Sequence, residues 1–173
     1  MLLIVVTEGD PKREIDWKYI KSFLDYRYGI RNKVKLKSIC LASKSKFQTA
    51  LPKIQNEISR FFKMRPGSSE PVVICLCFDT DYGAPAQEQN QRIEEFARAH
   101  GYRLAWMHRD VEEVFLGRRI PDKEKVRASD AFVNKQGIAS VDLHKLLASK
   151  FDGAPYGVSN IAVVFDELLG EPN

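Results

Sequence analysis

The chain has 173 residues, of which 44% are hydrophobic and 29% charged, and its formal net charge is +4 at pH 7. This length and composition predict a single globular domain over residues 1–173 that buries its core without disulfides. The sequence has no apolar run of the roughly 20 residues that a membrane helix needs. The apolar start, residues 1–6, is too short for a signal peptide. We therefore expect a cytoplasmic protein with no membrane partner.

The three cysteines, Cys40, Cys75 and Cys77, lie in apolar runs that are typical of strands. Their spacing is not that of a zinc knuckle. We interpret them as buried free thiols in a reducing compartment.

The charge is unevenly distributed along the chain. Residues 1–70 carry 15 Lys and Arg against 7 Asp and Glu, whereas residues 71–173 carry 12 against 16. The densest basic cluster lies within residues 33–46. A positive region beside an acidic site suits a polyanionic substrate. Lysines that protect a strand edge from aggregation explain the cluster equally well, so both interpretations stay open.

The first 110 residues alternate between apolar runs of strand length and stripes with helical spacing. Strands are expected at 2–6, 34–41, 72–78 and 103–108, and helices at 16–29, 51–61 and 86–100. Asp16 is expected to cap the first helix and Gly29 to end it. This alternation predicts an α/β, Rossmann-like fold with a mainly parallel four-stranded sheet flanked by helices. Right-handed crossovers then place the carboxyl ends of the strands at one edge, where ligands bind.

The rest of the chain predicts a helical C-terminal part, about residues 118–173, added to a core of about residues 1–117. Asp110 and Glu113 have the spacing of a capping box at a helix start. Further helices are expected at 126–133, 141–151 and 159–169, and a charged loop at 117–125.

Acidic residues follow two of the predicted strands. Glu8 lies two residues beyond the first strand, and Asp79 and Asp81 come directly after the third. In a parallel sheet all three emerge at one edge, where converging carboxylates are tolerated only if a proton or a cation neutralises them. Oxygen ligands favour Mg²⁺ or Mn²⁺. We therefore expect a divalent metal site, although helix caps or turns would also place acids after strands.

Two motifs resemble those of the Toprim family. The segment VVTEGD (5–10) is similar to its first motif, a hydrophobic strand that ends in Glu-Gly, and CFDTD (77–81) is similar to its Asp-x-Asp motif. The resemblance covers about residues 1–117. It implies that Glu8 is an acid/base residue or a metal ligand, and that Asp79 and Asp81 bind Mg²⁺.

The segment HRDVEEVFLG (108–117) resembles a later motif of OLD-like and RloB-like Toprim nucleases, with His108-Arg109-Asp110 where Asn-Pro is expected. The resemblance implies that Glu112 or Glu113 supplies a further acidic ligand. Glu112 is preferred, because Glu113 has a competing role in the capping box. In the loop that follows, Lys125 is a candidate to stabilise negative charge on a scissile phosphate.

Taken together, the motifs predict a Mg²⁺- or Mn²⁺-dependent nuclease that acts on DNA or RNA, with a role in phage defence implied by the resemblance. The alternative is a non-catalytic, Toprim-like interaction module. OLD-like domains act with an ABC-type ATPase, and this sequence has no G-x-x-x-x-G-K-[ST] motif, so such an ATPase would be a separate chain. A receiver-like or flavodoxin-like domain is disfavoured, because the acid pair follows the third strand and the first turn lacks a glycine-rich loop.

Overall fold

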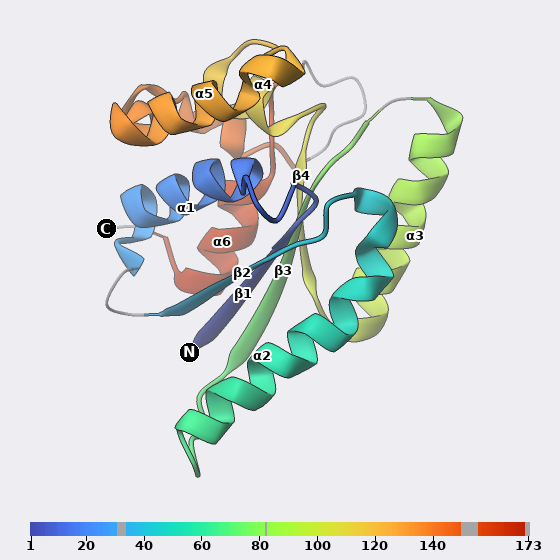
Figure 1. The fold of residues 1–173 in the computed structure, drawn as a ribbon, viewed down its shortest axis with the longest axis vertical. Helices are drawn as coiled ribbons and strands as arrows, with labels where there is room; N and C mark the ends of the chain where they lie inside the picture. The colour runs from blue at the N-terminus through green and yellow to red at the C-terminus, as the bar shows by residue number, and fades with distance from the viewer. Residues whose placement is uncertain (31–33, 82, 150–155, 172–173) are drawn as a thin grey trace.

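The structure, a computed structural model, describes residues 1–30, 34–81, 83–149 and 156–171. Within these ranges the chain forms one sheet of four strands, all parallel, in the order β2-β1-β3-β4 (Figure 1). The strands are β1 (Leu2–Thr7), β2 (Lys35–Cys40), β3 (Val72–Asp79) and β4 (Arg103–Met107). The α/β fold predicted from the alternation of strands and helices is therefore confirmed.

Helices cover both faces of the sheet (Figure 1). One face carries α1 (Ile15–Tyr28), α4 (Val111–Leu116), α5 (Asp122–Asn134) and α6 (Ile161–Leu169). The other carries α2 (Ala50–Met64) and α3 (Ala84–His100). No helix in the described part of the chain is both long enough and apolar enough to cross a membrane.

The central strand β1 is buried on both sides. Leu3 and Val5 face the α1 side, while Leu2, Ile4 and Val6 face the α2 side, and all five are fully buried. Side chains alternate between the two faces of a strand, so a strand covered on both faces is a continuous apolar run. This explains why residues 1–6 are all apolar.

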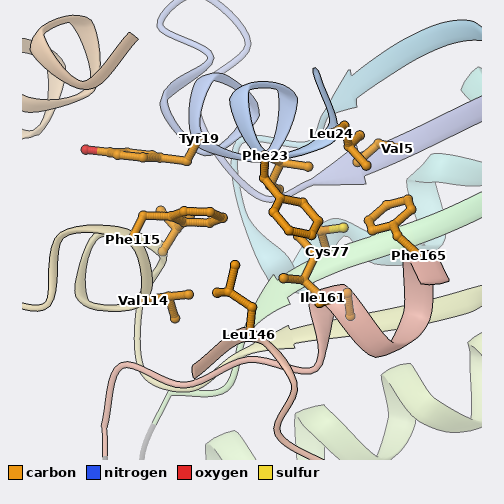
Figure 2. Close-up of a cluster of buried hydrophobic side chains, with 14 of the residues drawn as sticks. Val5, Tyr19, Phe23, Leu24, Cys77, Val114, Phe115, Leu146, Ile161 and Phe165 are labelled. Atoms are coloured by element: carbon orange, nitrogen blue, oxygen red, sulfur yellow. The ribbon is translucent and has the colours of Figure 1, made fainter. Parts of the chain in front are cut away.

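An aromatic cluster fills the space between the sheet and the helices of the α1 side (Figure 2). Tyr19 of α1 stacks on Phe115 of α4 with ring centroids 5.7 Å apart. Phe23 of α1 lies 6.5 Å from Phe165 of α6, centroid to centroid. The C-terminal helices thus share a core with the first half of the chain.

Two polar residues join α6 to β4. Buried Ser159 donates its hydroxyl to the Trp106 carbonyl at 2.7 Å, and Asn160 accepts the Trp106 N–H through Oδ1 at 2.7 Å. The Ser159 hydroxyl also accepts the N–H of Ile161 at 3.0 Å, so it caps the helix as well. The predicted start of the last helix near Ser159 is correct to two residues.

The helix predicted at 141–151 is wrong over its described part. Only Leu143–Leu146 is helical, as a short 3₁₀ helix (η4), and positions 150 and 151 lie outside the described residues. The cause is a long-range pairing. The Ser159 N–H donates to the Lys145 carbonyl at 2.7 Å, and the Ala148 N–H donates to the Ser159 carbonyl at 2.9 Å. These bonds use backbone groups that a continuing helix would need.

Two boundaries also differ from the prediction. The charged loop expected at 117–125 ends earlier, because α5 begins at Asp122 directly after Pro121, whose fixed φ suits a helix start. Asp16 does not cap α1. The cap position is Glu14, and Asp16 lies in the first turn with its carboxylate directed at Gly9. The predicted end at Gly29 is confirmed, in the left-handed conformation that glycine favours.

Phe165→Ala should cost about 3–5 kcal/mol of unfolding free energy, because it removes a fully buried ring from the shared core. Urea unfolding followed by circular dichroism measures the loss. Tyr26→Ala, which removes an aromatic ring that is 54% exposed, is the control and should cost below about 1 kcal/mol. A loss below about 1 kcal/mol for Phe165→Ala would show that α6 is not part of the core.

Candidate functional site: an acidic edge of the sheet

Carboxylates gather where the parallel strands end. Glu8 follows β1, Asp79 is the last residue of β3, and Asp110 follows β4. Asp16 from the start of α1 and Glu112 from α4 complete the group that we call the acidic edge. Glu8 Oε1 accepts the backbone N–H of Asp79 at 2.7 Å, so the structure brings these two predicted site residues together.

Glu8 and Asp79 are half-buried acidic residues with further carboxylates close by. Burial raises the pKa of Glu8 to about 7, and the Asp16 carboxylate adds to the rise, although the hydrogen bond from Asp79 opposes it. Burial also raises the pKa of Asp79 well above its usual range, and the nearby charges of Glu8 and Asp16 raise it further. These raised pKa values favour the protonated forms of both carboxyl groups, and a bound cation would favour the ionised forms.

Asp16 is a member of the site that the sequence analysis missed. Its carboxylate lies so close to Gly9 that a Cβ at position 9 would stand 2.8 Å from Oδ2. Burial raises its pKa, and the hydrogen bond from the Gly9 backbone opposes this effect. Position 9 therefore requires glycine, because the Asp16 carboxylate occupies the space that a side chain at position 9 would need. The sequence signal for this role is an acidic residue a few positions after Glu8-Gly9, but the same residue is also a normal helix cap, which is how we interpreted it.

Of the acids in the motif at 108–117, Glu112 lies close to the acidic edge. It is 1% exposed, and its charge contributes to the raised pKa of Asp79. Its Oε2 accepts a hydrogen bond from Lys125 at 3.0 Å, and its buried Oε1 has no partner among the described residues. Burial raises the pKa of Glu112, while the Lys125 cation opposes the rise.

Glu113 points elsewhere. Its Oε1 lies 3.4 Å from the Arg109 guanidinium, and its backbone N–H donates to the carboxylate of Asp110 at 2.8 Å. The second contact is the helix cap predicted from the spacing of these residues, and it is confirmed. Of the two candidates from the sequence, Glu112 therefore lies at the edge.

Lys125 brings a positive charge to the same edge. It projects from the first turns of α5 and is paired with Glu112. Burial lowers the pKa of Lys125, but the Glu112 carboxylate and the more distant charges of Asp110 and Asp79 outweigh this, so the net pKa is raised. The lysine is therefore charged and held beside the acids.

Asp81 does not join Glu8 and Asp79. Its carboxylate is 54% exposed, and Oδ2 lies 2.6 Å from the ammonium of Lys44. In the structure the Asp81 carboxylate therefore pairs with Lys44, and among the described residues it forms no group of three metal-binding side chains with Glu8 and Asp79.

The side chains of the edge are oxygen donors, which are the ligand type of hard divalent ions. Within the described ranges, no three His, Cys, Asp or Glu side chains are arranged to hold a metal on their own. Mg²⁺, however, is usually held by one or two carboxylates, with water and substrate phosphates completing its shell. Glu8 and Asp79 supply two carboxylates, and the unpartnered oxygen of Glu112 offers a further acceptor.

A basic and aromatic rim adjoins the loop after Asp79. The Thr80 hydroxyl lies 3.3 Å from Nδ1 of His108 and accepts the Arg109 N–H at 3.2 Å. The Arg109 guanidinium lies 4.3 Å from the centre of the Tyr156 ring, which is 54% exposed. These groups offer cationic and stacking surfaces close to the acids.

Fold and site together define an α/β protein whose parallel sheet ends in an acidic edge. Comparisons with protein-family models, with curated proteins and with solved structures found no match for this chain. The Toprim resemblance therefore rests on the motifs at 5–10, 77–81 and 108–117.

Glu8→Gln should stabilise the protein at pH 8 by on the order of 1–3 kcal/mol and have little effect near pH 4.5. The pKa of Glu8 is raised from 4.5 to about 7 on folding. The folded protein therefore binds a proton more tightly than the unfolded chain, and stability falls as pH rises between these values. Glutamine removes the ionisation and keeps an oxygen for the Asp79 N–H.

Urea unfolding at both pH values, with EDTA present, measures the difference. Glu94→Gln, an exposed position on α3, is the control and should show no such pH dependence. A Glu8→Gln variant that is less stable than the wild type at pH 8 would contradict the electrostatic description of the edge.

Proposed function

We propose that this protein is a Mg²⁺- or Mn²⁺-dependent nuclease that hydrolyses phosphodiester bonds at the acidic edge. The observation that carries the proposal is the hydrogen bond from the Asp79 backbone N–H to the Glu8 carboxylate, which joins two half-buried acidic residues with raised pKa values at the carboxyl end of a parallel sheet. Ligands of open α/β folds bind at this end. Strongly shifted acids in such a place are typical of functional sites.

Glu8 and Asp79 would hold the ion, and Asp16 and Glu112 are further acids whose charges act on Asp79. A bound ion of this kind lowers the pKa of a water molecule and offsets charge on phosphate oxygens. Lys125, positioned by Glu112, would place its ammonium beside the phosphate as negative charge develops there.

A nucleic acid is the polyanion that the charge distribution favours. Residues 1–70 carry the excess of positive charge, and Arg109 and Tyr156 lie beside the loop that follows Asp79. Contacts from such groups to phosphates and unpaired bases give affinity without sequence specificity. The three cysteines are free and buried, which supports a reducing, cytoplasmic location.

A second candidate is an interaction module that binds another protein, such as a separate ABC-type ATPase. The observation that favours it is a groove between α1 and the C-terminal end of α5. Its walls include Trp17, Tyr26 and Val133, and the last two are exposed. Exposed apolar side chains that line a groove are typical of docking surfaces. The two functions are compatible in one chain.

Asp79→Asn should weaken Mg²⁺ and Mn²⁺ binding about 100-fold or more, because even residues that only support a metal ligand commonly contribute 10–100-fold. Calorimetric titration measures the affinity, and cleavage of plasmid DNA and structured RNA should be lost in parallel. Asp142→Asn, which keeps an acceptor for the N–H of His144 at a short helix start, is the control. Wild-type affinity in Asp79→Asn would exclude this edge as the metal site.

Lys125→Met should lower kcat by about 100-fold with a smaller effect on KM, since the ammonium acts on charge that develops in the transition state. Lys125→Arg should recover part of the rate. Single-turnover cleavage with saturating Mn²⁺ is the measurement. A change confined to KM would assign Lys125 to substrate binding alone.

A further inference from the structure

Lys44 is a buried cation on the far side of the loop that carries the Asp-x-Asp motif. It is 3% exposed and begins the short 3₁₀ helix η2 (Lys44–Thr49). Its ammonium donates to the Asp79 carbonyl at 2.7 Å and to Asn90 Oδ1 at 3.1 Å, and it lies 2.6 Å from Asp81 Oδ2. A lysine has three N–H donors, so these three acceptors account for the whole ammonium group.

Among the described residues, the ion pair with Lys44 is the contact that holds the Asp81 carboxylate. Its backbone has φ of 48°, in the left-handed region that Asp tolerates better than most residues. Its carboxylate is more than half exposed, and its charge acts on Glu8, as does the charge of Lys44. Asp81 is therefore close enough to influence the acidic edge electrostatically while its carboxylate is engaged elsewhere.

We propose that Lys44 and a divalent cation at the acidic edge compete for the Asp81 carboxylate. In the ion-free protein Lys44 holds the Asp81 carboxylate in an ion pair. Glu8 and Asp79 are then the two carboxylates open to an ion, and Asp81 becomes the third when it leaves Lys44. The inference rests on the proposed function, because it takes the edge to be a metal site. Lys44 is then a positioning residue that acts through Asp81.

The rest of the loop is fixed without Lys44. The Asp79 N–H donates to Glu8, the Thr80 N–H donates to the Met107 carbonyl at 2.9 Å, and Asn90 Nδ2 donates to the Thr80 carbonyl at 2.6 Å. Removing the ammonium frees Asp81 and takes one donor from the Asp79 carbonyl and from Asn90 Oδ1, while the N–H groups of Asp79 and Thr80 keep their acceptors. This separation makes the competition testable by substitution.

The test is calorimetric titration of Mg²⁺ and Mn²⁺ into the wild type, Lys44→Met, Asp81→Asn and the double variant. Lys44→Met should bind about tenfold more tightly, the size expected for one charge–charge interaction near a protein surface. The metal affinity of Asp81→Asn should stay within about threefold of that of the wild type. The double variant should lose most of the affinity that Lys44→Met gains, because the effects of coupled positions are not additive. Lys44→Gln keeps a hydrogen-bond donor and replaces Lys44→Met if the latter does not fold.

Lys18→Met is the matched control, since it also removes one positive charge and one ion pair, that with Asp130. It should leave metal affinity within about twofold of the wild type, because exposed charges are well screened. Unchanged or weaker binding in Lys44→Met, beside a wild type that binds, would overturn this inference and leave the proposed function standing. An equal gain with and without Asp81 would also overturn it. A wild type that binds no ion would overturn both.

Discussion

The hydrogen bond from the Asp79 backbone to the Glu8 carboxylate joins the ends of the two central strands, and the acidic edge depends on it. The contact exists because β1 and β3 are parallel with Thr7 opposite Cys77, so Glu8 leaves the sheet beside the last residues of β3, which still pair with β4. This register is set by burial, since β1 is apolar on both faces. A slip of one residue would exchange the two faces of β1 and separate the carboxylate from its donor.

The positions of the lysines decide which acids of the edge are already paired with a positive charge. Lys125 is paired with Glu112 on one side, and Lys44 is paired with Asp81 on the other. Among the described residues, no lysine or arginine forms an ion pair with Glu8 or Asp79, whose pKa values rise as a result of burial and of repulsion by neighbouring carboxylates. An incoming cation would therefore meet its greatest stabilisation at this pair.

Sequence patterns predicted the sheet and its edge because those features depend on local signals. Apolar runs identify the four strands, their alternation with helices predicts parallel order, and parallel order brings Glu8 to Asp79. The segment around Leu146 was mispredicted because its backbone pairs with Ser159, a contact that no local pattern encodes. Lys44 and Asp16 were missed as parts of the site for the same reason. Each reaches the edge from a helix start whose position depends on the tertiary fold.

The most direct test of a metal site at this edge is a crystal structure of the protein grown with Mn²⁺, with the ion located by anomalous scattering. We expect a peak about 2.0–2.3 Å from carboxylate oxygens of both Glu8 and Asp79. A peak located only at other acids, or no peak at millimolar Mn²⁺, would contradict the account and leave the interaction module as the function to pursue.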